Sequence, residues 1–121
     1  EPKRAIKNCE QALEIAKKIG YKRGEGSNFG YLGLAYSDLG ETRKAIEYYE
    51  QALKIAREIG DRRGEGNSLG NLGNAHSYLG EPRKAIEFFK KSIAIGKAIE
   101  DPSIINLCEK NFKEPEVAEN N

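Results

Sequence analysis

A repeat with a period of 40 residues constrains this sequence more than any other feature. Positions 1–40 and 41–80 align without a gap, and 22 of the 40 aligned pairs are identical. The run Arg23–Gly26, for example, returns as Arg63–Gly66, and a third copy holds through about Ile99. A short unit repeated in this way cannot bury its apolar face alone, so the copies must stack to form a continuous core.

Each period contains two helical patterns. Apolar residues follow helical spacing from Ala45 to Ile59 and again from Leu69 to Leu79, and the alternation typical of strands is absent from both stretches. Four glycines follow the last periodic residues, where a left-handed residue ends a helix, namely Gly20, Gly40, Gly60 and Gly80. Asp61 directly precedes a helical run and is expected to cap it, as is Asp101. The pattern predicts antiparallel helices near 2–19, 22–39, 42–59, 62–79, 82–99 and 102–113.

The repeat boundaries predict how the chain is organised. Residues 1–20 correspond to the second helix of an incomplete repeat, 21–60 and 61–100 to two full repeats, and 101–113 to a capping helix. Residues 114–121 form a polar tail with a proline, which we expect to be disordered. Gly33 and Gly73 stand in helix interiors, where glycine costs about 1 kcal/mol relative to alanine. We therefore expect helices to approach closely at these two positions.

Two segments resemble the signature of the tetratricopeptide repeat (TPR) family. They are Phe29-x-x-Leu32-Gly33-x-x-Tyr36 and Ala45-x-x-x-Tyr49-x-x-Ala52. The next copy departs from the signature at Leu69, His76 and Ser92, and the period is 40 rather than the commoner 34. The run 60–74 is similar to the long-repeat TPR proteins of animal spindle-orientation and G-protein-regulator scaffolds, a style that many prokaryotic TPR proteins share. The resemblance implies an all-α fold, a right-handed superhelical solenoid of about six helices, and a non-catalytic function in binding a protein or peptide.

Charge and composition exclude several classes of function. The formal net charge is +1, without the basic surplus that nucleic-acid binding needs. The chain has neither an apolar run long enough to cross a membrane nor an apolar leader near residue 1, so we expect no membrane partner and no secretory signal. Cys9 and Cys108 lie far apart and suit neither a zinc site nor a disulfide framework. Unpaired cysteines favour a reducing compartment, and we predict a cytoplasmic location.

No catalytic, metal or cofactor site is predicted. His76 is the only histidine, and it falls on the apolar stripe without a nucleophile beside it, so a packing role is expected. Cys9 and Cys108 fall at core positions and are expected to be buried free thiols. The motif Gly24-x-Gly26-x-x-x-Gly30 and its copy at 64–70 follow no strand, and they are interpreted as helix-packing glycines rather than phosphate loops.

One polar stripe lacks a structural explanation. Asparagine is a mediocre helix former, yet three asparagines share one face of the helix at 62–79. In TPR folds the corresponding face lines the concave groove that holds a peptide or a partner helix. Carried over by position, the resemblance implies a groove made of Ser27, Tyr31, Leu34, Asp38, Asn67, Asn71, Asn74 and Tyr78. The alternative is a solvated polar face. A chaperone-type carboxylate clamp is not expected, because Gly30 and Leu34 stand where it needs lysine and asparagine.

The first helix suggests self-association as a second function. Its apolar stripe has no helix before it, and it consists of Ala5, Ile6, Cys9, Ala12, Leu13, Ala16 and Ile19. Burial of apolar surface contributes about 25 cal/mol per Å², so leaving such a stripe exposed is unfavourable. We therefore expect a homodimer through the N-terminal helix as the alternative to peptide binding.

Overall fold

A computed structural model describes residues 1–111 as six α-helices joined by short turns. The helices are α1 (Pro2–Ile19), α2 (Lys22–Asp38), α3 (Thr42–Ile59), α4 (Arg62–Tyr78), α5 (Pro82–Ala98) and α6 (Pro102–Asn111). The predicted helical ranges are confirmed, although α2, α4 and α5 each end one residue earlier than the pattern indicated. The predicted end of the last helix at 112–113 and the predicted tail at 114–121 lie outside the described residues.

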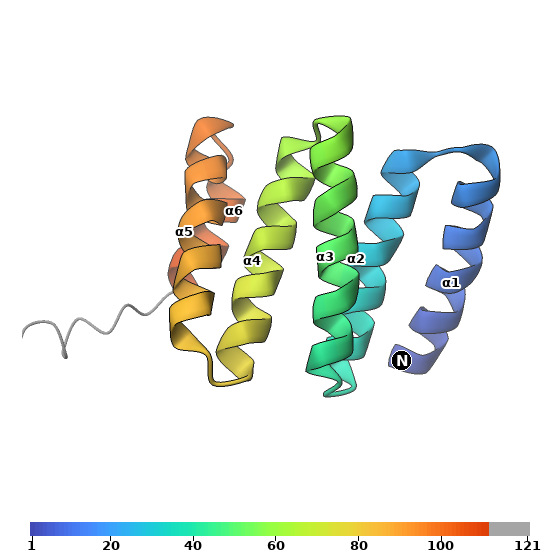
Figure 1. The fold of residues 1–121 in the computed structure, drawn as a ribbon, viewed down its shortest axis with the longest axis horizontal. Coiled ribbons are helices and arrows are strands. Elements are labelled where there is room, and N and C mark those ends of the chain that lie inside the picture. Colours follow the sequence, from blue (N-terminus) through green and yellow to red (C-terminus); the bar gives the residue numbers. More distant parts are fainter. Residues whose placement is uncertain (112–121) are drawn as a thin grey trace, which may run out of the picture.

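The helices stand in a row and alternate in direction, with α1 at one end and α5 at the other, and α6 lies behind α5 (Figure 1). Each helix contacts the next one along the chain. Within the described residues, the backbone of α2 also approaches that of α4, and α4 approaches α6, whereas the backbones of the odd-numbered helices do not approach one another in this way. The even-numbered helices therefore lie closer to one another than the odd-numbered helices do. We call the side that they form the inner face of the stack.

The helix ends follow the predicted glycine pattern. Gly20, Gly40, Gly60 and Gly80 all have left-handed φ angles, between 72° and 79°. After α1, the amide of Tyr21 donates to the Ala16 carbonyl at 2.9 Å, which closes the turn in the manner of a Schellman motif. Glu100 takes the place of the glycine after α5, with a φ of 54°. This is the one non-glycine residue with positive φ in the described part of the chain.

Two aspartates cap helices as predicted. The carboxylate of Asp61 accepts a hydrogen bond from the Gly64 amide at 3.0 Å, at the start of α4. Asp101 accepts from the Ser103 amide at 3.0 Å and from the Ser103 hydroxyl, at the start of α6. These bonds satisfy amides that have no partner within the first turn of a helix.

The cap at Asp101 predicts an acid-sensitive helix start. Its hydrogen bonds from Ser103, together with the Arg63 guanidinium, lower the pKa of the Asp101 carboxyl below its ordinary value. A carboxyl with a lowered pKa stabilises the fold above its unfolded pKa of about 3.9, and this contribution is lost as pH falls through the folded-state pKa. We expect Asp101→Asn, which keeps a cap but cannot titrate, to lose less thermal stability on acidification than the wild type. Melting curves by circular dichroism measure this, with the exposed Glu58→Gln as control; equal acid sensitivity of Asp101→Asn and wild type would contradict it.

The core confirms the close approaches predicted at two glycines. A Cβ atom on Gly73 would lie 2.7 Å from the ring of Phe89, and one on Gly33 would clash with the ring of Tyr49. Both rings are buried, as is the central Leu72. Aromatic side chains thus fill the space that the missing Cβ atoms leave, and this fixes the distance between the two helices of each repeat.

His76 has the packing role that its position predicts. Its ring stacks on Phe88 with the centroids 5.2 Å apart, and its Nδ1 atom lies 2.8 Å from a carboxylate oxygen of Glu81. Both cysteines are free, but only Cys108 is buried, whereas Cys9 is partly exposed. Burial raises the pKa of both thiols. Full burial of Cys9 was therefore a wrong prediction, because no helix within residues 1–111 covers the outer side of α1.

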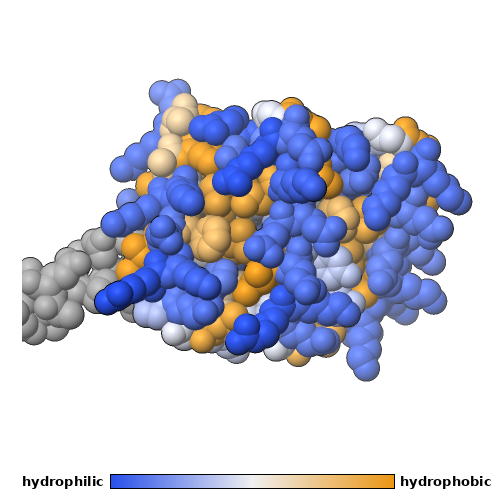
Figure 2. Space-filling view, viewed as in Figure 1, coloured by the Kyte–Doolittle hydropathy of each residue, from blue (hydrophilic) through white to orange (hydrophobic). Residues whose placement is uncertain are grey.

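Among the helices that the structure describes, none is long and apolar enough to cross a membrane. Hydrophilic side chains cover most of the face seen in Figure 2, and hydrophobic ones show between them over the helix boundaries.

Candidate interaction groove

A cavity of about 290 Å³ opens on the inner face of the stack, between α2 and α4 and above α3. The floor comes from α3, which contributes only apolar side chains, and the two walls come from the even-numbered helices. The lining residues are Arg23, Gly26, Ser27, Gly30, Tyr31 and Leu34 of α2, Ala52, Ile55, Ala56 and Ile59 of α3, and Asp61, Gly64, Asn67, Ser68 and Asn71 at α4. The floor is thus apolar and the rim is polar.

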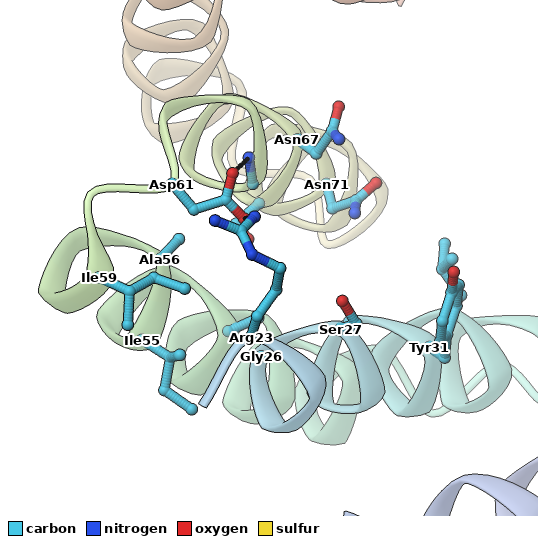
Figure 3. Close-up of a pocket in the computed structure, with 15 residues that line it drawn as sticks. Arg23, Gly26, Ser27, Tyr31, Ile55, Ala56, Ile59, Asp61, Asn67 and Asn71 are labelled. Atoms are coloured by element: carbon cyan, nitrogen blue, oxygen red, sulfur yellow. Dashed lines mark hydrogen bonds and ion pairs between the residues drawn. The ribbon is translucent and has the colours of Figure 1, made fainter. Parts of the chain in front are cut away.

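One ion pair joins the two walls. The Arg23 guanidinium extends from α2 to the Asp61 carboxylate, with Nη1 and Oδ2 3.3 Å apart (Figure 3). The same carboxylate caps α4 through the Gly64 amide. Among the described residues that line the cavity, Arg23 and Asp61 alone are charged, and each neutralises the other. The site therefore presents no uncompensated charge to a ligand.

The asparagine amides lie on the α4 wall. Asn67 is exposed and Asn71 half-buried; both line the cavity, and Figure 3 shows Asn71 beside the open space above α2, whereas the Asn67 side chain points away from α2. Neither amide has a hydrogen-bond partner within residues 1–111, in contrast to Asn28, whose amide donates to the Gly24 carbonyl at 2.9 Å. Both amides are therefore free to donate to and accept from a ligand.

The structure brings together five of the eight residues that the resemblance implied for the groove. Ser27, Tyr31, Leu34, Asn67 and Asn71 line the cavity. The other three, Asp38, Asn74 and Tyr78, lie nearer the C-terminal ends of α2 and α4 and do not line it. Tyr78 is 75% exposed, at the last residue of α4.

Sequence reasoning missed the apolar floor and the small residues of the walls. Ala56 and Ile59 fall on the stripe that predicts core, and the structure shows that they, together with Ile55, also line the cavity. The assignment of all six motif glycines to helix packing was wrong for Gly30, where a Cβ atom would meet nothing within 4 Å, and for Gly24, where it would meet only Tyr21 at the start of the same helix. The sequence signal that could have found the cavity is the recurrence of small residues at 26, 30, 64 and 68, on helices two apart in the row.

The described residues contain no group of three or more histidine, cysteine, aspartate or glutamate side chains that could hold a metal ion. Every buried side-chain nitrogen or oxygen atom in this part of the chain has a hydrogen-bond partner.

Comparison with known proteins agrees with this architecture. A model of the tetratricopeptide repeat matches residues 1–58 and again 30–98. A signal-transduction ATPase with a TPR sensor, from Pyrococcus horikoshii, superposes with a TM-score of 0.83 at 29% identity, over 89% of this chain and 17% of that protein. The TPR domain of FLU from Arabidopsis superposes with a TM-score of 0.76 at 26% identity, over 81% of this chain and 82% of that one. No curated protein matches the chain by sequence.

These matches define the chain as a helical-repeat domain. The chain belongs to the tetratricopeptide repeat family. Domains of this family generally act as protein-interaction modules. The similarity to RapI, at 22% identity and a TM-score of 0.83, supports the fold alone.

Proposed function

We propose that this chain is a non-catalytic module that binds a peptide or a helix of a partner protein in the groove between α2 and α4. The observation that carries the proposal is the cavity on the inner face, with an apolar floor and free asparagine amides at its rim. Ligand sites commonly combine an apolar lining with a few convergent polar groups. The Pyrococcus protein, 29% identical, carries its TPR region as a sensor, which agrees with a role in recognition.

The two amides of the α4 wall support binding of a polypeptide backbone. Asn67 and Asn71 stand four residues apart, so they lie on one helix face about one turn apart. Each amide offers both a donor and an acceptor, which matches the alternating groups of a peptide backbone. Binding of this kind places few demands on the side chains of the ligand.

Replacing both asparagines by alanine tests the proposal. Peptides are first selected from a random display library on the immobilised chain, and their affinities are measured by fluorescence polarisation. A net contribution of about 1 kcal/mol per hydrogen bond predicts that Asn67→Ala with Asn71→Ala weakens binding about tenfold or more. The double variant Asn8→Ala with Asn106→Ala removes two exposed amides outside the cavity and should bind like the wild type. Unchanged affinity of the Asn67/Asn71 variant, or a selection without enriched peptides, would contradict the groove assignment.

Self-association is favoured as a second role by a different observation. Ile15 and Ile19 on the outer side of α1 are 60% and 70% exposed, whereas Ile55, the equivalent of Ile15 one repeat later, is 8% exposed. Gly26 of α2 covers Ile55, and nothing covers Ile15 within residues 1–111. The remainder of the predicted stripe is partly or fully buried, including Leu13.

We expect the chain to form a dimer at micromolar concentration through Ile15 and Ile19, because pairing removes these side chains from water. Sedimentation velocity measures the dimer. Ile15→Glu with Ile19→Glu should give a monomer, and Leu34→Glu with Tyr78→Glu, which also replaces exposed apolar residues, should leave the dimer unchanged. A wild-type chain that sediments as a monomer at these concentrations rules out this role.

A further inference from the structure

The two inter-repeat spaces of the molecule can be compared position by position. Arg23 of α2 pairs with Asp61 before α4 at 3.3 Å, and Arg63 of α4 pairs with Asp101 before α6 at 2.9 Å. These two ion pairs are related by a shift of 40 residues. The helix α6 is therefore placed against α4 and α5 as α4 is placed against α2 and α3.

Side chains of α6 fill the second inter-repeat space, which lies between α4 and α6. The Cδ1 atom of Ile104 lies 3.2 Å from where a Cβ atom of Gly66 would stand, and its Cγ2 atom lies 3.0 Å from the equivalent point on Gly96. One turn later, the Cys108 sulfur lies 3.3 Å from the Cβ position of Gly70. Ile104 is 3% exposed and Cys108 1% exposed, so this space is closed.

The first inter-repeat space, between α2 and α4, has no equivalent of the Ile104 and Cys108 side chains. Gly64 and Ser68 of α4 stand where α6 has Ile104 and Cys108. Gly30, the equivalent of Gly70, consequently meets nothing within 4 Å, and Gly26 meets only Ile55. Ala56 stands at the position equivalent to Gly96, so its methyl group is the one added side-chain group at this place. The cavity above α3 is thus the place that an isoleucine side chain fills one repeat later.

We propose that the cavity binds a branched aliphatic side chain, isoleucine, leucine or valine, of the bound peptide or helix. This proposal rests on the function proposed above and names the partner residue that the groove selects. The intramolecular contacts of Ile104 show that a branched aliphatic group fits between the equivalent glycines. The cavity volume of about 290 Å³ is ample, since an apolar cavity of roughly 150 Å³ already admits benzene.

The charges of the lining support a neutral occupant. Arg23 and Asp61 neutralise each other across the cavity, so a charged side chain would lose its hydration without gaining a counter-ion. The apolar floor of Ile55, Ala56 and Ile59 offers dispersion contacts and no hydrogen bonds to such a group. The amides of Asn67 and Asn71 stand at the rim, where the backbone that carries the aliphatic residue would pass.

Peptides selected on the full chain from a random display library test the proposal. We expect the binders to share an isoleucine, leucine or valine at one position. Replacing that residue by aspartate should weaken binding about tenfold or more, as burial of an aliphatic side chain contributes about 1.5–3 kcal/mol. The variant Gly64→Ile, which places the isoleucine of α6 into α4 and also displaces the Asp61 carboxylate beside it, should weaken binding of the same peptides at least as much.

A second variant fills the cavity from the opposite wall. Gly30→Leu should also weaken binding about tenfold, and it meets no atom near its Cβ position and raises helix propensity. The control Ser77→Leu adds a leucine to the exposed side of α4, outside the cavity, and should bind like the wild type. Circular dichroism establishes that each variant retains its helices, so the test remains decisive if Gly64→Ile fails to fold.

The outcomes separate this proposal from the proposed function. Binders without a shared aliphatic residue overturn the proposal, and so does wild-type affinity in Gly30→Leu. If such binders still lose affinity in the Asn67→Ala, Asn71→Ala variant, peptide binding stands and only the aliphatic selectivity falls. A selection that enriches no peptide overturns both.

Discussion

Replacing Leu72 by alanine should lower the free energy of unfolding by about 2–5 kcal/mol, the range for large-to-small changes in a packed core. Leu72 is 0% exposed and belongs to the cluster formed by α3, α4 and α5. The members of this cluster come from three successive helices, so the cavity left by the Leu72 side chain lies in a core shared by two repeats. Urea denaturation followed by circular dichroism measures the change.

Leu34→Ala provides the matched control. Leu34 is also a helical leucine, but it is 45% exposed and lines the groove. Its truncation removes little buried surface and should change stability by about 0.5 kcal/mol or less. If the two variants lowered the free energy of unfolding equally, the core would not centre on Leu72.

The second large effect is expected from Gly73→Ala. An alanine Cβ atom at this position would lie 2.7 Å from the ring of Phe89, which is buried, with 3% of its surface exposed. Overpacking of this kind costs about 1–3 kcal/mol and should outweigh the roughly 1 kcal/mol that alanine gains over glycine within a helix. Thermal unfolding should therefore occur at a lower temperature than in the wild type.

Replacing Gly30 by alanine should stabilise the fold, in contrast to the same substitution at Gly73. A Cβ atom on Gly30 meets nothing within 4 Å, so only the helix-propensity gain of about 0.5–1 kcal/mol remains. The pair compares one chemical change at two helical glycines of the same array. Stabilisation by Gly73→Ala would show that Phe89 can shift and that close packing does not explain the glycine.

The fold could be predicted almost completely from the sequence, because the repeat shows each local signal more than once. Gly20, Gly40, Gly60 and Gly80 end helices at the predicted positions, and Asp61 and Asp101 begin them. Each signal depends on residues adjacent in the chain. The helix limits are therefore accurate to within one residue for α1 to α5.

The groove could be predicted only in part, because its shape depends on residues 40 positions apart. Helical register indicates that Ser27, Tyr31 and Asn71 face outward, and these residues line the cavity. Helical register alone predicts the same environment for Gly30 and Gly70, because they occupy equivalent positions in the repeat. The structure distinguishes them because Cys108 covers Gly70, whereas no side chain of the described residues lies within 4 Å of the Cβ position of Gly30.

The aspartates at the starts of α4 and α6 couple the repeats energetically. Asp61 binds an amide of its own helix and the guanidinium of Arg23 from the preceding repeat, and Asp101 does the same with Arg63. The start of each helix is thus completed by its predecessor in the array. In the language of a one-dimensional lattice, this adds a nearest-neighbour term to the intrinsic stability of each unit. Melting of one unit removes a partner from the next, so cooperativity in this array should extend beyond a single hairpin.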